Sequence, residues 1–200
     1  MSFVIESRYF EDVVVVAPRP YRDERGFFVE TYRADRFEEL GLPTNFVQDN
    51  QSVSRKGVIR GLHFQWDQPM GKLMRVTAGT AFLVAVDIRK GSATLGKWAG
   101  LEVSAENMKQ VWAPAGFARG FCALTENVVV QYKCTATYNS KAESAILWND
   151  PAVGIEWPLK EVLLSQKDGQ ARTLNEWLAS PNSEHLLYTR PPDSKQTPIR

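Results

Sequence analysis

The sequence contains two histidines, and one of them stands where it could transfer a proton or bind a metal. His63 lies within the apolar run 58–65, which has the residue types of a strand. A histidine in such a run acts either as a general base or ligand, or as a core residue satisfied by a hydrogen bond. His185 lies near the polar C-terminal end, and we expect it to be exposed to solvent. Two histidines are few for a metal site built from imidazoles.

A second group of residues would share one face of a strand. In regular alternation, four aromatic or small side chains project to the same side: Tyr132, Cys134, Ala136 and Tyr138. Such a face suits the wall of a cavity that admits a planar ligand, and it suits a packed core equally well. Lys72 begins another run with an apolar face. Its ammonium group therefore either reaches solvent at the strand end or points into a polar pocket.

Three arginines each stand directly before a glycine: Arg25, Arg60 and Arg119. A planar guanidinium group matches phosphate oxygens, and the adjacent glycine lets a backbone or a ligand approach closely. Three such pairs would form an anion site for a diphosphate if the fold brings them together. Taken alone, each arginine is more commonly a surface charge.

The segment 114–121 is a turn that leads into a strand, and it resembles the second sequence motif of the cupin barrels. Cupin metal sites use two or three histidines and a carboxylate, but this chain has Arg119 at the usual ligand position and no His-x-His pair. Because a guanidinium group does not bind metals, we expect no metal site. The Gly-x-Gly-x-x-Gly fingerprint is absent as well, so no nicotinamide cofactor is expected.

The composition describes one ordinary domain. The 200 residues are 44% hydrophobic and 24% charged, as in a folded globular chain. A net charge of +1 disfavours nucleic-acid and membrane-surface binding, which need a basic excess. The start has no signal-peptide pattern and no apolar run approaches about 18 residues, so we expect no membrane span and a cytoplasmic location. There, Cys122 and Cys134 are expected to be free thiols.

Short runs rich in β-branched and aromatic residues recur along the chain, separated by turn residues. They predict strands at 13–16, 26–32, 46–48, 58–65, 72–77, 81–89, 98–103, 109–113, 117–124 and 128–138. Many short, closely spaced strands indicate an all-β antiparallel sandwich or barrel. Short helices are predicted at 34–41, ending at a glycine, and at 173–178, with Thr173 as the N-cap. We expect a single domain over residues 1–184 and a loosely ordered tail over 185–200.

The chain contains a set of short motifs. Each motif alone has little specificity for a protein family, but their order and spacing together are highly specific. The motifs are Asp-Glu-Arg-Gly-Phe-Phe-Val-Glu at 23–30, Gln-Asp-Asn at 48–50, Ile-Arg-Gly-Leu-His-Phe-Gln at 59–65, Gly-Lys-Leu at 71–73, Val-Asp-Ile-Arg at 86–89, Leu-Glu-Val-Ser-Ala-Glu-Asn at 101–107, Gln-Tyr-Lys at 131–133, Trp-Asn-Asp-Pro at 148–151 and Leu-Ser-Gln-Lys-Asp at 164–168. With these motifs the chain closely resembles the dTDP-4-dehydrorhamnose 3,5-epimerase family, from about residue 13 to about residue 177.

The resemblance implies an antiparallel jelly-roll (cupin-like) barrel with a few short peripheral helices, and a homodimer that exchanges an N-terminal strand. It implies an isomerase without metal or cofactor that converts the dTDP-linked 4-keto-6-deoxy sugar dTDP-4-dehydro-6-deoxy-D-glucose to dTDP-4-dehydro-L-rhamnose, in dTDP-L-rhamnose biosynthesis. By the family pattern His63 is the general base, and Asp168 orients it. Tyr132 is the acid on the opposite face, and Lys72 stabilises the enolate oxygen. The residues implied to bind the nucleotide are Arg25, Phe27, Glu30, Gln48, Asn50, Arg60, Tyr138, Glu143 and Lys167.

These residue types suit the chemistry independently of the resemblance. Epimerisation next to a ketone removes a proton from one face of a carbon and returns a proton to the other face. It therefore needs a base, an acid opposite the base, and a positive group for the developing oxyanion. A histidine has an ordinary pKa close to cytoplasmic pH, and a tyrosine donates a proton without carrying charge beforehand.

One residue departs from the family pattern. The family usually has Phe-Ala-His-Gly-Phe, with a histidine that contacts substrate, where this chain has Arg119. An arginine at that substrate-binding position donates hydrogen bonds but cannot accept a proton. The change raises an alternative function, a single-centre (3- or 5-) epimerase of a related nucleotide-linked 4-keto-6-deoxy sugar. A catalytically silent nucleotide-sugar binder is a further class, and the intact set of acid, base and cation argues against it.

Overall fold

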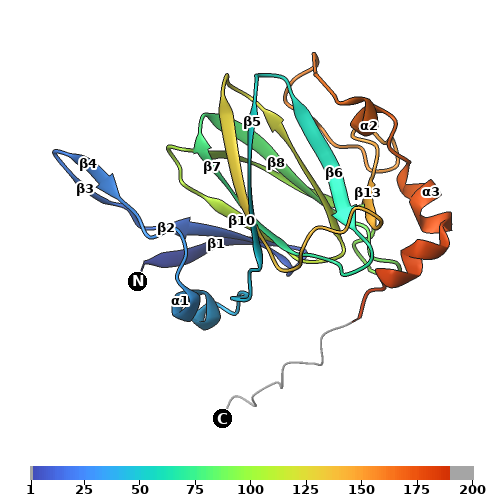
Figure 1. Cartoon of the computed structure of the whole chain (residues 1–200), viewed down its shortest axis with the longest axis horizontal. Coiled ribbons are helices and arrows are strands. Elements are labelled where there is room, and N and C mark those ends of the chain that lie inside the picture. The colour runs from blue at the N-terminus through green and yellow to red at the C-terminus, as the bar shows by residue number, and fades with distance from the viewer. Residues whose placement is uncertain (1, 190–200) are drawn as a thin grey trace, which may run out of the picture.

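Two antiparallel sheets form the body of the computed structural model, which describes residues 2–189 (Figure 1). The six-stranded sheet has the order β1 (Phe3–Tyr9), β2 (Val13–Pro18), β10 (Gln110–Ala113), β7 (Lys72–Ala78), β12 (Val128–Cys134) and β5 (Gln48–Ser54). The five-stranded sheet has the order β13 (Glu143–Ala145), β6 (Ile59–Gln65), β11 (Phe117–Ala123), β8 (Thr80–Asp87) and β9 (Trp98–Ser104). The predicted all-β, jelly-roll (cupin-like) barrel with few short helices is confirmed.

The interior between the sheets is filled by alternate side chains of the strands. Leu83, Phe117 and Val130 are among its fully or nearly fully buried members. The outer face of the five-stranded sheet is buried too, because a C-terminal segment packs Trp177 and Ile146 against it. Burial on both faces explains why β11 has no exposed position and reads as a continuous apolar run interrupted by a single arginine.

Short helices lie at the periphery, close to their predicted positions. Helix α1 (Ala34–Glu39) buries Phe37, and Gly41 follows it with a φ of +71°, which glycine adopts without strain. Helix α3 (Leu174–Ala179) begins at Thr173, whose side chain caps the Glu176 amide and completes a capping box. The predicted N-cap is therefore confirmed. No helix within residues 2–189 is long and apolar enough to cross a bilayer.

Some predicted strand limits are wrong, for identifiable reasons. The 26–32 prediction ends early, because β4 (Gly26–Phe28) pairs only with the three-residue strand β3 (Tyr21–Asp23). The strand predicted at 46–48 begins at Gln48 and continues to Ser54; its extent was missed because most of its residues are polar. The 128–138 prediction ends at Cys134, so Tyr138 lies on a loop and not on the strand face. Strand β1 and the single-turn helix α2 (Gln166–Gly169) were not predicted.

The packed part of the chain continues past the predicted boundary at residue 184. The 3-10 helix η1 (Pro181–His185) leads to Leu186, which is 4% exposed and lies in the cluster on the outer face. Leu187 then forms a bridge to Lys90. The boundary is therefore wrong by several residues, since an apolar side chain in this polar stretch is buried. His185 is exposed, as predicted. Residues 190–200 of the expected tail lie outside the described residues.

A local irregularity brings β6 and β11 very close to each other. The register between them shifts after the pair Arg119–His63, so that Phe121 opposes Arg60 and β6 carries one extra residue. Gly61 sits at this point with a φ of +136°, and a Cβ there would lie 2.5 Å from the Gly120 Cα. Two of the Arg-Gly pairs thus meet through their glycines, as close approach of two backbones requires.

Candidate active site

A histidine–carboxylate pair joins the five-stranded sheet to the C-terminal segment. His63 lies on β6, and its Nε2 is 2.6 Å from Oδ1 of Asp168, which lies on α2. The helix is held by its N-cap, because the Asp168 amide donates to Ser165 Oγ at 3.0 Å. Burial raises the pKa of Asp168, but its hydrogen bond and charge interaction with His63 outweigh that effect and leave the pKa below its usual value. The carboxylate is thus placed to hold one tautomer of the imidazole, with Nδ1 left for proton transfer.

A half-buried lysine faces this pair from the opposite sheet. Lys72 lies on β7, and its Nζ is 4.9 Å from the centre of the Tyr132 ring on β12. The pKa of Lys72 is lowered to about 8, mainly by burial and next by the positive charge of Arg119, against smaller opposing effects of Cys134 and Glu143. The pKa of Tyr132 is raised, chiefly by burial, so its phenol keeps its proton at neutral pH.

These side chains line one cavity of about 230 Å³ between the two sheets. Its lining consists of Gln48, Asn50, His63, Phe64, Gln65, Met70, Lys72, Tyr132, Cys134, Tyr138 and Glu143. An imidazole on one sheet therefore faces a phenol and an ammonium group on the other. Such a cavity can hold a planar intermediate with the base on one face and the acid on the opposite face.

The mouth of the cavity carries most of the residues expected to bind the nucleotide. Tyr138 donates through its hydroxyl to Glu143 Oε2 at 2.7 Å and through its amide to Gln48 Oε1 at 2.8 Å. Gln48 in turn donates to Asn50 Oδ1 at 3.1 Å, and Lys167 forms an ion pair with Glu143. These five residues come from β5, β13, α2 and the loop after β12, and the fold brings them together.

Arg60, which is also expected to bind the nucleotide, is not among the residues that line the cavity. It is exposed, its Nε donates to Ser54 Oγ at 3.0 Å, and its NH2 group donates to the Val53 carbonyl. Its positive charge reaches Tyr132, whose pKa it lowers slightly against the larger effect of burial. The guanidinium group is thus available to an anion at the mouth.

Arg119, which is expected to contact the substrate, lies in the interior. It is 3% exposed, does not line the cavity, and donates through one terminal nitrogen to the carbonyls of Met70, Ala113 and Pro114 at 2.8–3.2 Å. The side chain points across the interior, and this one terminal nitrogen donates to the protein backbone. The expected substrate contact of Arg119 stays a prediction. Among residues 2–189, its Nε has no hydrogen-bond partner.

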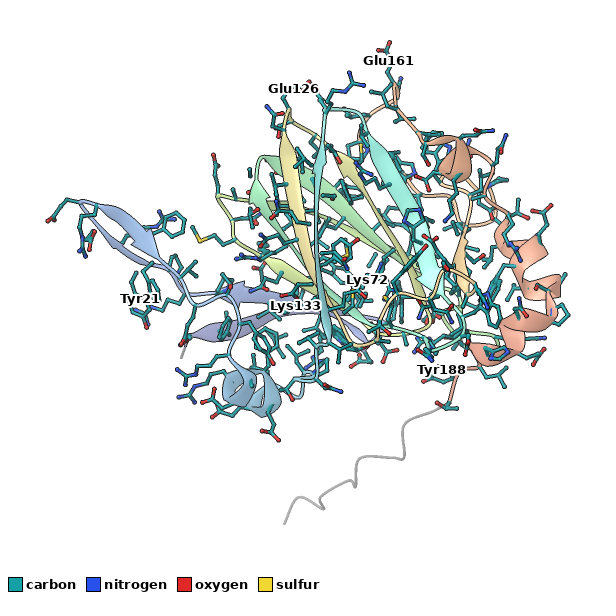
Figure 2. All side chains as sticks on the ribbon, in the orientation of Figure 1. Tyr21, Lys72, Glu126, Lys133, Glu161 and Tyr188 are labelled. Carbon is teal, nitrogen blue, oxygen red and sulfur yellow. The ribbon has the colours of Figure 1, made fainter. Side chains whose placement is uncertain are left out.

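Three of the expected nucleotide-binding residues lie far from the cavity within one chain. Arg25 and Phe27 belong to the β3–β4 hairpin, which projects from the body on the side away from α2 and α3 (Figure 1). Arg25 pairs with Asp23 on the same hairpin, and Glu30 pairs with Arg33. Figure 2 shows Tyr21 on this projecting side and Lys72 inside the body. A single chain therefore lacks these contacts at its site.

Three residues that line the cavity were not singled out from the sequence, Phe64, Gln65 and Met70, and Gln65 is the polar one among them. Gln65 is 4% exposed and donates to the carbonyls of Gln68 and Thr137, while its Oε1 accepts from the Asn139 amide at 2.8 Å. It thus ties together the two loops at the mouth. Strand alternation could have found it, because His63 and Gln65 are two residues apart and face the same side.

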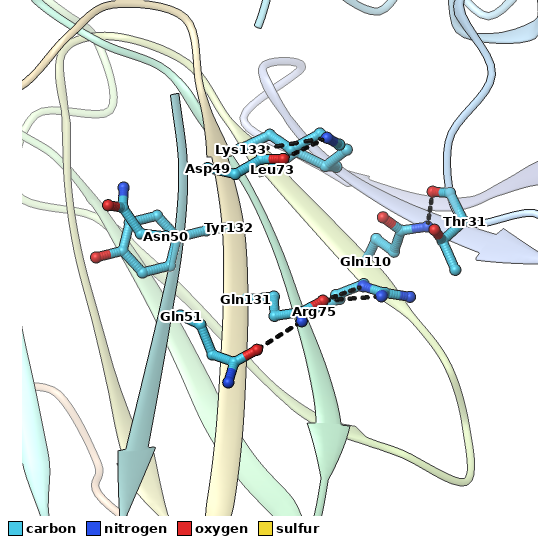
Figure 3. A pocket seen from close by; sticks show the side chains of 10 residues that line it. All are labelled: Thr31, Asp49, Asn50, Gln51, Leu73, Arg75, Gln110, Gln131, Tyr132 and Lys133. Atoms are coloured by element: carbon cyan, nitrogen blue, oxygen red, sulfur yellow. Dashed lines mark hydrogen bonds and ion pairs between the residues drawn. The ribbon is translucent and has the colours of Figure 1, made fainter. Parts of the chain in front are cut away.

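The six-stranded sheet carries a polar face on the side away from the cavity. Arg75 donates to Gln131 Oε1 at 2.8 Å, and Gln131 donates to Gln51 at 2.7 Å, so that a chain of side chains crosses β7, β12 and β5 (Figure 3). It borders a polar hollow of about 390 Å³. Among residues 2–189, no three His, Cys, Asp or Glu side chains lie close enough to hold a metal, and both cysteines are free.

Known proteins are similar to this chain in sequence over most of its length, and solved structures share its architecture. The family model described as dTDP-4-dehydrorhamnose 3,5-epimerase matches residues 8–176. The dTDP-4-dehydrorhamnose 3,5-epimerase of Salmonella typhimurium is 51% identical over 181 residues, which cover 89% of this chain and 98% of the relative. The dTDP-4-dehydrorhamnose 3-epimerase of Streptomyces niveus is 38% identical over 169 residues, covering 83% and 81%.

Among solved structures, the dTDP-6-deoxy-D-glucose-3,5-epimerase of Legionella pneumophila in complex with dTDP-4-keto-L-rhamnose superposes with a TM-score of 0.88. It is 46% identical and the match covers 94% of this chain and 100% of that one. Sequence and fold agree over nearly the whole length. The chain belongs to the dTDP-4-dehydrorhamnose 3,5-epimerase family of isomerases.

Proposed function

We propose that this protein epimerises dTDP-4-dehydro-6-deoxy-D-glucose at C3 and C5, giving dTDP-4-dehydro-L-rhamnose for dTDP-L-rhamnose synthesis. One observation carries the proposal. A carboxylate-paired histidine on one sheet faces a protonated phenol and a half-buried ammonium group on the other sheet, across a single cavity. The reaction needs no redox cofactor, because no electrons are transferred to or from the sugar, and Lys72 supplies a positive charge for the enolate oxygen from within the cavity.

In this mechanism His63 removes the proton from the carbon next to the C4 ketone, and the electron pair of that C–H bond forms the enolate. Asp168 stabilises the resulting imidazolium. The negative charge on the C4 oxygen is stabilised by Lys72. Tyr132 then delivers its proton to the opposite face of the same carbon. The imidazolium loses its proton to solvent and the phenolate regains one, so the cycle at C3 and at C5 closes without net change.

The nucleotide would lie at the mouth of the cavity. Lys167 and Arg60 are cations there, and both suit a diphosphate. The aromatic ring of Tyr138 is 56% exposed and is free to stack on a base. Glu143 and Gln48 hold Tyr138 in place before ligand binds.

We also propose that the active form is a homodimer, in which each hairpin β3–β4 reaches the site of the partner. Phe27 and Phe28 are 53% and 68% exposed, an apolar surface that a lone chain would leave in water. Arg25 and Glu30 would then add a cation and a carboxylate to the partner's nucleotide site. Sedimentation equilibrium tests this: a dimer is expected, and a monomer with full activity would contradict it. The free thiols Cys122 and Cys134 fit a cytoplasmic location, where disulfides are rare.

Solvent exchange tests the function directly. In deuterated water the enzyme should place deuterium at both C3 and C5 of the 4-keto sugar nucleotide. Label at one carbon only would favour the single-centre alternative, which Arg119 and the similarity to a 3-epimerase motivate. The higher identity to 3,5-epimerases supports exchange at both carbons. No label at either carbon would refute the proposal and favour a silent binder.

A further inference from the structure

Arg119 crosses the interior of the barrel from one sheet to the other. It stands on β11 directly opposite His63 of β6 in the antiparallel register. Its terminal nitrogen donates to the Met70 carbonyl at 2.8 Å and to the Ala113 and Pro114 carbonyls at 3.2 Å. Those acceptors belong to the opposite side of the cavity, at the ends of β7 and β10.

The acceptors of Arg119 lie on both sides of the catalytic lysine. Met70 is two residues before Lys72 in the chain. Ala113 is the residue that pairs with Lys72 across β10 and β7. One side chain therefore ties the strand next to the base to the backbone that carries the cation. A change in that link would change the separation between His63 and Lys72.

The charge of Arg119 is buried and meets only neutral acceptors. Its three hydrogen bonds go to carbonyl oxygens, and no carboxylate of residues 2–189 forms an ion pair with it. A buried charge without a counter-ion is costly, and low local polarity lets its field act strongly on nearby groups. Lys72 is such a neighbour, so two like charges lie beside one cavity.

We propose that Arg119 is a positioning residue of the epimerase site, which fixes Lys72 relative to His63 and keeps a second positive charge behind it. This inference rests on the proposed role of Lys72. Without an anion the two cations repel each other, whereas an enolate oxygen in the cavity attracts both. The arrangement thus favours the intermediate over the neutral ketone, which is the difference that lowers a barrier.

The ionisation of Lys72 reports on this arrangement. Its pKa is lowered to about 8, first by burial and then by Arg119. The pKa of Arg119 itself is lowered to about 10, mainly by burial. The other titratable groups of the cavity come from three places. Tyr132 and Cys134 lie on the neighbouring strand β12, His63 and Glu143 lie on the facing sheet, and Tyr138 lies on the loop after β12.

Two substitutions separate the charge of Arg119 from its hydrogen bonds. Arg119→Met removes both, and Arg119→Lys keeps the charge on a shorter side chain with weaker contact to the carbonyls. Arg75→Met is the matched control, because Arg75 lies on β7 like Lys72 but bonds Gln131 on the outer face. Two measurements are made on each protein: the titration of Lys72 by NMR with ¹³C-labelled lysine in the absence of ligand, and kcat and KM for deuterium exchange across pH.

We expect Arg119→Met to raise the titration midpoint of Lys72 from about 8 toward the ordinary value of 10.5. Its kcat should fall about tenfold or more, with KM changing less. Arg119→Lys should keep the midpoint near that of the wild type and recover part of kcat. Arg75→Met should change neither quantity. A merely structural role for Arg119 would lower kcat without moving the midpoint upward.

An unmoved midpoint in a folded, active Arg119→Met protein overturns the proposal, and so does an equal loss of kcat in the Met and Lys variants. If Arg119→Met fails to fold, Arg119→Gln takes its place. A titration midpoint of Lys72 near 10.5 in the wild-type protein overturns the proposal without any variant. The titration needs no substrate. A wild type that exchanges no deuterium therefore contradicts the proposed function, whereas an active wild type with an unmoved midpoint in the variant contradicts the role of Arg119.

Discussion

Replacing Asp168 by asparagine tests the histidine–carboxylate pair with little disturbance of the fold. The side chain is buried, and its Oδ1 lies 2.6 Å from His63 Nε2. Asparagine has nearly the same shape and leaves the backbone bond from residue 168 to Ser165 in place. Its amide oxygen can still accept from Nε2, so the variant removes the negative charge and keeps the geometry.

The size of the effect follows from that charge. A hydrogen bond to a charged group contributes about 1.5–3 kcal/mol. Proton transfer to His63 creates an imidazolium, and the neutral amide no longer stabilises it. Since each 1.36 kcal/mol changes a rate about tenfold, kcat should fall roughly ten- to 150-fold. Asp168→Ala also frees the ring to rotate, so its kcat should fall further. Affinity for dTDP should stay within about threefold in both, because the proposed nucleotide site lies at the mouth of the cavity.

The assay is single-turnover deuterium exchange at C3 and C5, with dTDP affinity measured by calorimetry. Asp150→Asn serves as the control. Asp150 is 2% exposed and accepts from the amides of Leu174 and Ala152, so its replacement should lower thermal stability and leave kcat of the folded protein unchanged. A kcat of Asp168→Asn within about twofold of the wild type would refute the role of the carboxylate. A parallel loss of dTDP binding would show that Asp168 acts on structure.

Other perturbations test the opposite wall and the backbone. Above pH about 8, kcat should fall as Lys72 loses its proton, and a flat kcat profile to pH 9.5 would contradict this. The free energy of unfolding should rise between pH 8 and 10.5, because in that range the unfolded chain keeps the proton of Lys72 and the folded chain does not. Tyr132→Phe should impair turnover more than dTDP binding, and unchanged turnover would place the acid elsewhere. Gly61→Ala should cost about 1–3 kcal/mol in urea unfolding, because its Cβ would lie 2.5 Å from Gly120 Cα at a positive φ; an unchanged free energy of unfolding would show that the strands relax freely.

The barrel was predictable from the sequence where burial shapes the residue pattern. Strands with buried faces, such as β8 and β11, read as apolar runs and were found at almost their full length. Strand β5 was not, because its inward residues, Gln48 and Asn50 among them, are polar groups of the site. Functional demands on a strand thus remove the signal by which strands are recognised.

The site was less predictable, because its partners come from distant parts of the chain. Local pattern placed His63 on a strand, but Asp168 lies 105 residues further on, in a helix of one turn. Only the resemblance joined the two residues. For Arg119, alternation with Phe117 and Phe121 already implies an inward direction. The carbonyls that accept its hydrogen bonds could not be predicted, because they depend on the register of β7 and β10, and the spacing of residues in the sequence does not determine that register.

The two facing sheets explain why this fold suits epimerisation. Packed sheets lie about 10 Å apart, which leaves room for one sugar ring between a side chain from each sheet. His63 comes from the five-stranded sheet, and Tyr132 comes from the six-stranded sheet. Acid and base therefore approach a ring from opposite faces by virtue of the architecture itself. Inversion requires that arrangement, whereas exchange with retention would need the proton returned to the face that it left, which a single base can do. A substitution that moves either sheet should thus slow inversion more than it weakens nucleotide binding, which depends on the mouth.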